Sequence, residues 1–209
     1  MLFRLPPEAL VLLIPTLMFA LSFHEFSHAW MAYKCGDSTA ARMGRLTLNP
    51  LAHLDLFGSI MILFVGFGWA KPVPVDPRSL NQPRVDMMKV AAAGPISNLL
   101  LALIGGIVFR IFNSVPLLSG NMILMIYYFT SINISLAIFN LIPVSPLDGS
   151  QIFSGYLIKK NPQLALKIQS YGPQVLFGLI LFGYITGFSI IWFVMKPFVS
   201  FFMYLFAGV

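Results

Sequence analysis

Charge is what this sequence has least of. Lys, Arg, Asp and Glu together make up 10% of its 209 residues, whereas a soluble domain carries about 25%. Because 58% of the residues are hydrophobic, too little polar surface is left to face water. The composition excludes a soluble enzyme and predicts an integral membrane protein with about six spans and no separate soluble domain.

Cysteine is almost absent as well. The single Cys35 excludes an intrachain disulfide. The net charge of +6 indicates, in a membrane protein, topology and contact with lipid headgroups rather than nucleic-acid binding. We therefore expect the lipid bilayer as a partner, and no nucleic acid.

Long apolar runs are what the chain does contain. They fall at about 9–33, 51–68, 85–113, 121–143, 171–186 and 188–208. The first run could be read as a secretory signal, because it follows Arg4. However, it continues past Leu21 without a charged stop, so we treat it as a retained first span.

The basic residues predict which connections face the cytoplasm. They gather in three stretches, 34–50, 70–89 and 144–170. By the positive-inside rule these stretches are cytoplasmic. Segment 51–68 would then start and end on the same side, so either it re-enters or one cluster is misplaced. Asp55 and Gly58, with Gly66 and Gly68, favour a bent, re-entrant course buried in protein.

The five residues from His24 to His28 carry the clearest chemical signal. They read His-Glu-Phe-Ser-His and hold two of the three histidines of the chain. On a helix, His24 and His28 lie one turn apart on the same face. Both imidazoles can then reach one zinc ion, and Glu25 can take a proton from a metal-bound water. Such polar groups are costly at membrane depth, and a metal would compensate for them.

A catalytic zinc usually has three protein ligands and a water, so one ligand is missing from this motif. Asp148 is the best candidate, because it follows Pro143 and Pro146, where an apolar helix ends and the chain can turn inward. The alternative is that Asp148 caps a helix over 149–159. The spacing alone leaves both interpretations open.

Two stretches, 42–48 and 69–77, have the alternation or the proline pattern of extended chain. The alternative, and the more common outcome for such stretches, is that both are loops. As strands they would form a small membrane-embedded sheet whose free edge accepts an extended peptide. The side chains that we expect to contact substrate are then Leu46, Leu48, Pro72, Val73, Pro74 and Val75.

Four motifs together resemble the site-2 protease family of intramembrane zinc metalloproteases. They are H-E-x-x-H at 24–28, the proline-rich stretch 68–77, Gly-Pro-x-x-Asn at 94–98 and N-x-x-P-x-x-x-L-D-G at 140–149. They occur in the order of the family and extend over almost the whole chain. No stretch resembles the PDZ or CBS domains of some relatives, so the chain resembles a minimal core form.

The resemblance implies one Zn²⁺ per chain, held by His24, His28 and Asp148, with Glu25 as general acid and base. It implies that Asn140 lies near the substrate carbonyl, although bridging two broken helices is the alternative for this residue. The implied fold is an all-α polytopic membrane protein of six helices with a three-helix catalytic core. We expect a single domain over 1–209, with its core at about 9–159 and accessory helices at about 165–209.

The implied reaction is hydrolysis of peptide bonds within or near the transmembrane segments of membrane proteins. The implied location is the prokaryotic inner membrane, with the site nearer the cytoplasm. We expect Asn98 to bond the active-site helices together. His53 either tunes the site or is structural or lines a water path. The sequence names no substrate and no oligomeric state.

Two rivals from other classes remain, a membrane zinc transporter and a catalytically silent zinc-binding membrane protein. A transport path needs ligands at successive depths, and only one histidine lies outside the motif. A purely structural zinc site has no need of a base, so Glu25 disfavours the second rival.

Overall fold

The computed structural model describes residues 7–65, 68–113 and 120–209. Four of its helices are long and apolar enough to cross a membrane, namely α1 (Pro7–Lys34), α4 (Pro83–Asn113), α5 (Gly120–Asn140) and α8 (Ile190–Ala207). At 1.5 Å per residue, even the shortest reaches about 27 Å, close to the thickness of the hydrocarbon core. The chain is therefore a helical, multi-pass membrane protein.

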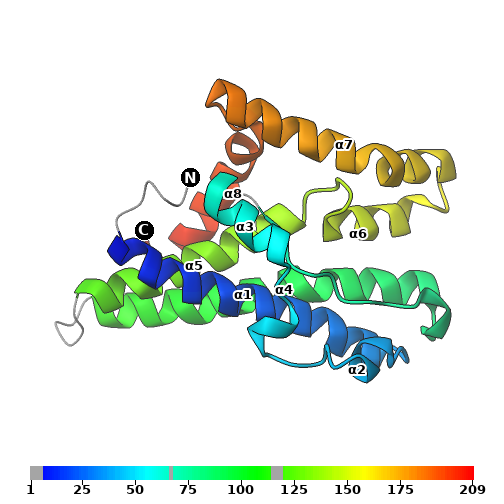
Figure 1. Cartoon of the computed structure of the whole chain (residues 1–209), viewed down its shortest axis with the longest axis horizontal. Helices are drawn as coiled ribbons and strands as arrows, with labels where there is room; N and C mark the ends of the chain where they lie inside the picture. The colour runs from blue at the N-terminus through cyan, green and yellow to red at the C-terminus, as the bar shows by residue number, and fades with distance from the viewer. Residues whose placement is uncertain (1–6, 66–67, 114–119) are drawn as a thin grey trace.

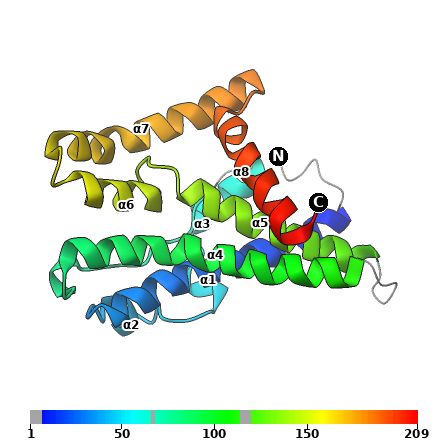
Figure 2. The same cartoon turned by 180° about the vertical axis from the view of Figure 1, so that it is seen from behind.

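The central bundle consists of α1, α4 and α5. Helix α4 packs along both α1 and α5, and the three run lengthwise beside one another (Figures 1 and 2). Helix α8 crosses α4 and α5 and closes an apolar cluster made by Ala102, Phe109, Ile134, Met195, Val199, Met203 and Ala207. A Cβ atom at Gly106 would lie 2.6 Å from the backbone of Phe206, so this crossing requires a glycine.

The end of α8 is tied to the end of α4. The Arg110 guanidinium donates to the backbone oxygens of Tyr204, Leu205 and Phe206 at 2.8–3.0 Å. These carbonyls belong to the last turn of α8, where few helical donors remain; Tyr204 O also accepts from the Gly208 amide at 3.0 Å. The two helices therefore end beside each other.

Six spans were expected, but only four helices in the described part of the chain are both long enough and apolar enough to cross a membrane. Run 171–186 belongs to α7 (Pro162–Thr186), which is long enough but carries Lys167 and three glutamines. Most of α7 is exposed, and it packs mainly on α6 (Asp148–Leu157).

Run 51–68 contains α3 (Leu56–Val65), which has 10 residues and is about 15 Å long, half the hydrocarbon core. Leu54 and Ala70 form an antiparallel bridge on either side of it. A Cβ atom at Gly58 would collide with the backbone oxygen of Trp69. The residues on either side of α3 thus lie next to each other, which is compatible with the re-entrant course that stays a prediction. Gly66, one of the glycines used to predict this course, lies outside the described residues.

The expected small sheet is not found in the residues that the structure describes, where the bridge of Leu54 with Ala70 is the only β pairing. The prediction of a strand over 42–48 is wrong. Helix α2 (Thr39–Arg42) ends there, and Gly44 turns the chain with φ +68°. Alternation of residue types misled the prediction, because a glycine with positive φ interrupts an extended chain.

Segment 69–77 is extended, but it is anchored by single hydrogen bonds rather than by a ladder. The Lys71 amide donates to His53 O at 2.8 Å, and the buried Arg45 guanidinium donates to Lys71 O at 2.5 Å. The Asp76 amide donates to the Asp37 carboxylate at 2.8 Å. Two short 3-10 turns, Pro50–Ala52 and Pro77–Ser79, complete this side of the molecule.

Candidate active site

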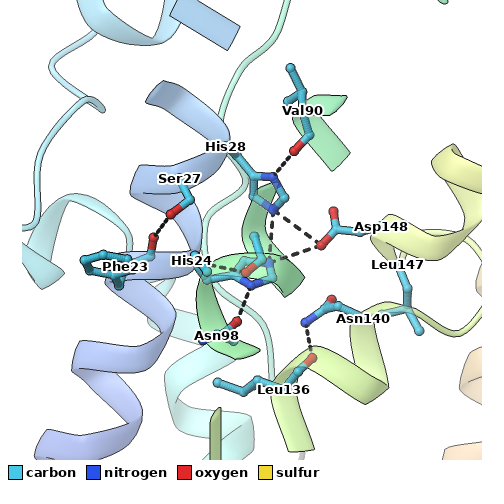
Figure 3. Close-up of polar contacts among 12 residues, drawn as sticks. Phe23, His24, Ser27, His28, Val90, Asn98, Leu136, Asn140, Leu147 and Asp148 are labelled. Carbon is cyan, nitrogen blue, oxygen red and sulfur yellow. Dashed lines mark hydrogen bonds and ion pairs between the residues drawn. The ribbon is translucent and has the colours of Figure 1, made fainter. Parts of the chain in front are cut away.

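Helix α1 presents His24 and His28 one turn apart, as the helical spacing predicts. Both side chains are buried, and their Nε2 atoms lie 3.0 Å apart. Figure 3 shows both rings directed away from the α1 backbone toward α4 and α6. The pair is thus enclosed by protein rather than by lipid.

Helix α4 supplies a partner to the other nitrogen of each ring. His28 Nδ1 lies 2.7 Å from Val90 O, and His24 Nδ1 lies 2.6 Å from Asn98 Oδ1. Both partners are oxygens that only accept, so each imidazole carries its proton on Nδ1. The lone pairs on both Nε2 atoms are therefore available for a metal.

Asp148 comes to the histidines from 120 residues or more along the chain. Its Oδ2 atom lies 3.1 Å from His24 Nε2 and 3.3 Å from His28 Nε2. Asp148 is the first residue of α6, and Leu147 is the N-cap. The Asp148 side chain thus faces the histidines and does not cap the helix. Its neighbour Gly149 lets α6 start against the carbonyl of Ile142, which a Cβ atom would approach to 2.6 Å.

The three ligand atoms fit a zinc ion. They lie within 4.8 Å of one another, and no other such group of three occurs among the described residues. In a tetrahedral site with zinc–ligand distances of about 2.0–2.1 Å, neighbouring ligand atoms are about 3.3 Å apart. The separations of 3.0, 3.1 and 3.3 Å come close to this value. Two nitrogens and one carboxylate oxygen are also a ligand set typical of catalytic zinc.

Gly94 on α4 is a residue whose role the sequence reasoning missed. A Cβ atom there would lie 2.5 Å from the Nε2 atoms of both His24 and His28. Real Cβ atoms essentially never make contacts that short, and the rigid imidazole rings cannot relieve the overlap by flexing. Position 94 therefore needs a glycine. The signal was present in the Gly-Pro of the third motif, but a motif does not say which side chains its glycine faces.

A cavity of about 490 Å³ opens beside His24, His28 and Asp148. Glu25 from α1 and Asn140 from the end of α5 both line it. The Asn140 Nδ2 donates to Leu136 O within α5 at 3.0 Å (Figure 3), and within the described residues its amide makes no hydrogen bond to another helix. The remaining wall is largely apolar and includes Leu21, Trp69, Leu136, Phe139 and Leu176.

The expected substrate contacts are only partly brought to this cavity. Pro72, Val73 and Val75 are among the residues that line it. Pro74, Leu46 and Leu48 are not among them. The turn at Gly44 directs residues 46 and 48 away from an extended course, which removes the reason for predicting them as contacts.

His53 and Asn98, the two remaining candidates, have different surroundings. His53 is buried outside the cavity lining, with Nε2 at 2.8 Å from Thr47 O. Asn98 is fully buried between α1 and α5, with Nδ2 at 3.2 Å from Ala20 O and 2.8 Å from Asn133 Oδ1. Asn133 was not singled out from the sequence, because no motif surrounds it in the apolar helix α5.

Comparisons with known proteins agree with this geometry. The model of Peptidase family M50 matches residues 12–120 and 104–183. A Bacillus subtilis (strain 168) protein named as a zinc metalloprotease, YwhC, is 38% identical over 192 residues, which cover 90% of this chain and 87% of YwhC. A Mycolicibacterium smegmatis protein named as a zinc metalloprotease, Rip2, is 26% identical over 82% of this chain and 67% of its own length.

A zinc metalloprotease of Methanocaldococcus jannaschii is 25% identical over 78% of this chain and 40% of its own length. No solved structure matches significantly. The first matched segment contains the histidine pair and the Gly-Pro turn, and the second contains Asp148. The chain therefore belongs to Peptidase family M50, the site-2 protease family, and is an intramembrane zinc metalloprotease.

Proposed function

We propose that His24, His28 and Asp148 hold the zinc ion and that Glu25 moves the protons of the reaction. The observation that carries this proposal is the arrangement of three lone-pair-bearing atoms, Nε2, Nε2 and Oδ2, 3.0–3.3 Å apart. Three such acceptors repel one another unless a cation lies between them. The Nδ1 protons cannot relieve this repulsion, because both are given to Val90 O and Asn98 Oδ1.

When bound, zinc lowers the pKa of a water molecule and polarises the scissile carbonyl. Glu25 follows His24 directly in α1 and lines the same cavity. Its carboxylate takes the proton from the attacking water and passes it to the leaving amine. Peptide-bond hydrolysis requires both transfers, and Glu25 is the one carboxylate besides Asp148 among the residues that line the cavity.

Asn140 stabilises the negative charge that develops on the substrate carbonyl. Its Nδ2 has two hydrogens, and Leu136 O accepts one of them. The second is available to an oxygen in the cavity that Asn140 lines. A fixed donor aimed at the developing oxyanion lowers the barrier without reorganisation.

The substrate lies along segment 72–75 as an unwound, extended peptide. Pro72 and Pro74 have no N–H, so the amides of Val73 and Val75 are the donors that the segment retains for a substrate strand. Val73 and Val75 also line the cavity. A transmembrane helix that unwinds there replaces its internal hydrogen bonds with bonds to this edge.

The active site lies on the cytoplasmic side of the prokaryotic inner membrane. Lys34 is the last residue of α1, Lys71 precedes segment 72–75, and Arg84 is the second residue of α4. All three lie at the end of the bundle where the site lies. Positive charge at one end of a bundle marks the cytoplasmic end. All proposed catalytic residues lie in one domain of one chain, so the chemistry needs no second copy.

The transporter alternative lacks a path of ligands. Within the described residues, His24, His28 and Asp148 form the only group of three potential metal ligands. A transported ion needs successive sites along its course, whereas one site beside a peptide-sized cavity suits hydrolysis.

Substitution of Glu25 by glutamine separates these functions. We expect Glu25→Gln, reconstituted in liposomes with single-span membrane proteins, to cleave about 10²- to 10⁴-fold more slowly. Bound zinc should remain at one ion per chain. Asp55→Asn makes the same chemical change outside the cavity and should leave both values unchanged.

Two results would contradict the assignment. Undiminished cleavage by Glu25→Gln would mean that another group moves the proton. Loss of zinc from that variant would mean that Glu25 is a ligand. Substrates would then be identified in cells, by comparing the membrane-protein fragments that accumulate when the wild type is expressed with those that accumulate when Glu25→Gln is expressed.

A further inference from the structure

A chain of buried amides runs from α5 through α4 to the histidine pair. Asn133 Oδ1 accepts a hydrogen bond from Asn98 Nδ2 at 2.8 Å, and Asn98 Oδ1 lies 2.6 Å from His24 Nδ1. Asn133 and Asn98 are both 0% exposed. Buried polar groups at membrane depth are rare and cost free energy, so this row of buried amides needs a physical explanation.

The two imidazoles are oriented in different ways. His28 Nδ1 faces a backbone carbonyl, that of Val90, which has only one orientation in the helix. His24 Nδ1 faces the side-chain amide of Asn98. A side-chain amide can turn by 180° and present NH₂ in place of oxygen, so the second arrangement needs something more to define it.

Asn133 is a hydrogen-bond partner that defines the orientation of the Asn98 amide. Its Nδ2 donates to Phe129 O at 2.8 Å, which fixes its own amide, because a carbonyl can only accept. Its Oδ1 must then face α4, where Asn98 Nδ2 donates to it. Ala20 O accepts from the same Nδ2 at 3.2 Å. Turning the Asn98 amide would set its oxygen against two other oxygens, those of Asn133 and Ala20.

The orientation of Asn98 decides the tautomer of His24. With Oδ1 toward the ring, the proton sits on Nδ1, and the Nε2 lone pair faces His28 and Asp148. With NH₂ toward the ring, Nδ1 would have to accept, and the proton would move to Nε2. A protonated Nε2 cannot bind a metal.

We propose that Asn133 is a positioning residue for the zinc site, which acts through Asn98 by holding His24 in the tautomer that leaves Nε2 free. The proposal rests on the ligand set His24, His28 and Asp148. Asn133 is neither one of the three proposed ligands nor one of the residues that line the cavity. It makes zinc affinity depend on α5, a helix that contributes no ligand.

Thr130 provides a matched control. It lies one turn before Asn133 on α5, is also 0% exposed, and donates within the helix to Ile126 O at 2.9 Å. No hydrogen bond connects it to His24 in the described residues. Thr130→Val and Asn133→Leu each replace a buried polar group by an apolar one of similar size, but only Asn133→Leu removes the partner of Asn98.

The test is zinc affinity, measured on the purified full chain in detergent by competition with a chelator. Loss of a partner that orients a ligand lowers metal affinity by about 10- to 100-fold, and we expect Asn133→Leu to fall near the lower limit. Thr130→Val should stay within about twofold of wild type. Excess zinc should restore the cleavage rate of Asn133→Leu, because the reacting groups are intact.

A double-substitution cycle excludes a merely structural role. In a chain that already carries Asn98→Ala, adding Asn133→Leu should change zinc affinity no further. An equal effect in both backgrounds, or wild-type affinity in Asn133→Leu, would overturn the proposal. If Asn133→Leu does not fold, as judged by circular dichroism without zinc, Asn133→Thr tests the same bond. Its hydroxyl can bond to Phe129 O as Thr130 does to Ile126 O.

Failure of the ligand set gives a different result. His24→Ala should lose zinc far more completely than any asparagine variant. If His24→Ala binds zinc like the wild type, the ligand assignment is wrong, whatever Asn133 does.

Discussion

The two halves of the proposed zinc site are held in different ways. His24 and His28 sit in α1 against α4, and each Nδ1 has an oxygen partner at 2.6–2.7 Å. Asp148 starts the ten-residue helix α6, and within the described residues its carboxylate has only the two histidines as partners. Hydrogen bonds thus orient the two imidazoles, whereas the course of the backbone defines the position of the carboxylate.

Close backbone contacts hold the carboxylate half. A Cβ atom at Gly149 would reach Ile142 O at 2.6 Å, and one at Gly172 of α7 would reach the Ser145 amide nitrogen at 2.6 Å. Only Ala165, Gly172 and Leu176 of α7 are buried. The two imidazoles are therefore held by the central bundle, whereas the position of Asp148 depends on how α6 packs against α4 and α7.

Removal of the charge from the carboxylate half should have the largest effect. Asp148→Asn keeps the shape of the side chain but leaves zinc with two neutral ligands. We expect zinc affinity to fall by more than the 100-fold upper value for loss of an orienting partner, with loss of cleavage. The measurement is bound zinc against increasing chelator. Wild-type retention of zinc would show that α6 contributes no ligand.

A methyl group pressed against the histidine half should have the next largest effect. Gly94→Ala places a Cβ atom 2.5 Å from both Nε2 atoms, and overpacking of this kind costs about 1–3 kcal/mol. We expect that loss to appear in zinc affinity, measured by the same competition. Gly155→Ala on α6 is the control, because its Cβ atom would meet the flexible Met88 side chain and should disturb the site less. Equal effects of the two substitutions would contradict a preset histidine half.

Truncation of the wall that α7 contributes should change substrate binding but not zinc. Leu176 lines the cavity and is 6% exposed. Leu176→Ala removes part of an apolar wall worth about 1 kcal/mol to a bound side chain, so KM should rise about fivefold. Leu166→Ala, at a position 61% exposed on the same helix, should leave KM unchanged. A drop in zinc affinity in Leu176→Ala would show that α7 fixes Asp148 directly.

Acid should loosen the segment that joins the cavity to the bundle. Burial raises the pKa of Asp37, but hydrogen bonds from Thr39 and from the Asp76 amide outweigh it and hold this pKa below its usual value. The stabilisation is present above the unfolded value of ~3.9 and is lost as pH falls through the lower folded pKa. The protection of the Asp76 amide against hydrogen exchange, taken relative to the rate of an unstructured amide at the same pH, should fall below about pH 4.

Asp37→Asn is the control for this effect, and it should show fast exchange at Asp76 at every pH. A protection of the Asp76 amide, relative to an unstructured amide, that does not change in the wild type between pH 5 and pH 3 would mean that the Asp37 carboxylate does not anchor segment 69–77.

Some expectations failed for identifiable physical reasons. Residues 42–48 alternate like a strand, yet Gly44 adopts a positive φ and ends the pattern. Run 171–186 is apolar enough to suggest a span, but it continues a helix that begins with polar residues. His53 could be placed only by the fold, because its partner Thr47 is a turn contact that no motif announces.

The sequence by itself determined the membrane class, from the scarcity of charge, and the pairing of His24, Glu25 and His28, from helical spacing. Its four motifs also determined the family. Only the tertiary structure decided that Gly94 faces both imidazoles and that the three proposed ligand atoms meet. The partners of the two histidines lie 62, 74 and 124 residues away along the chain. Local propensities act over a few residues, so contacts at such separations exist only once α1, α4, α5 and α6 have packed.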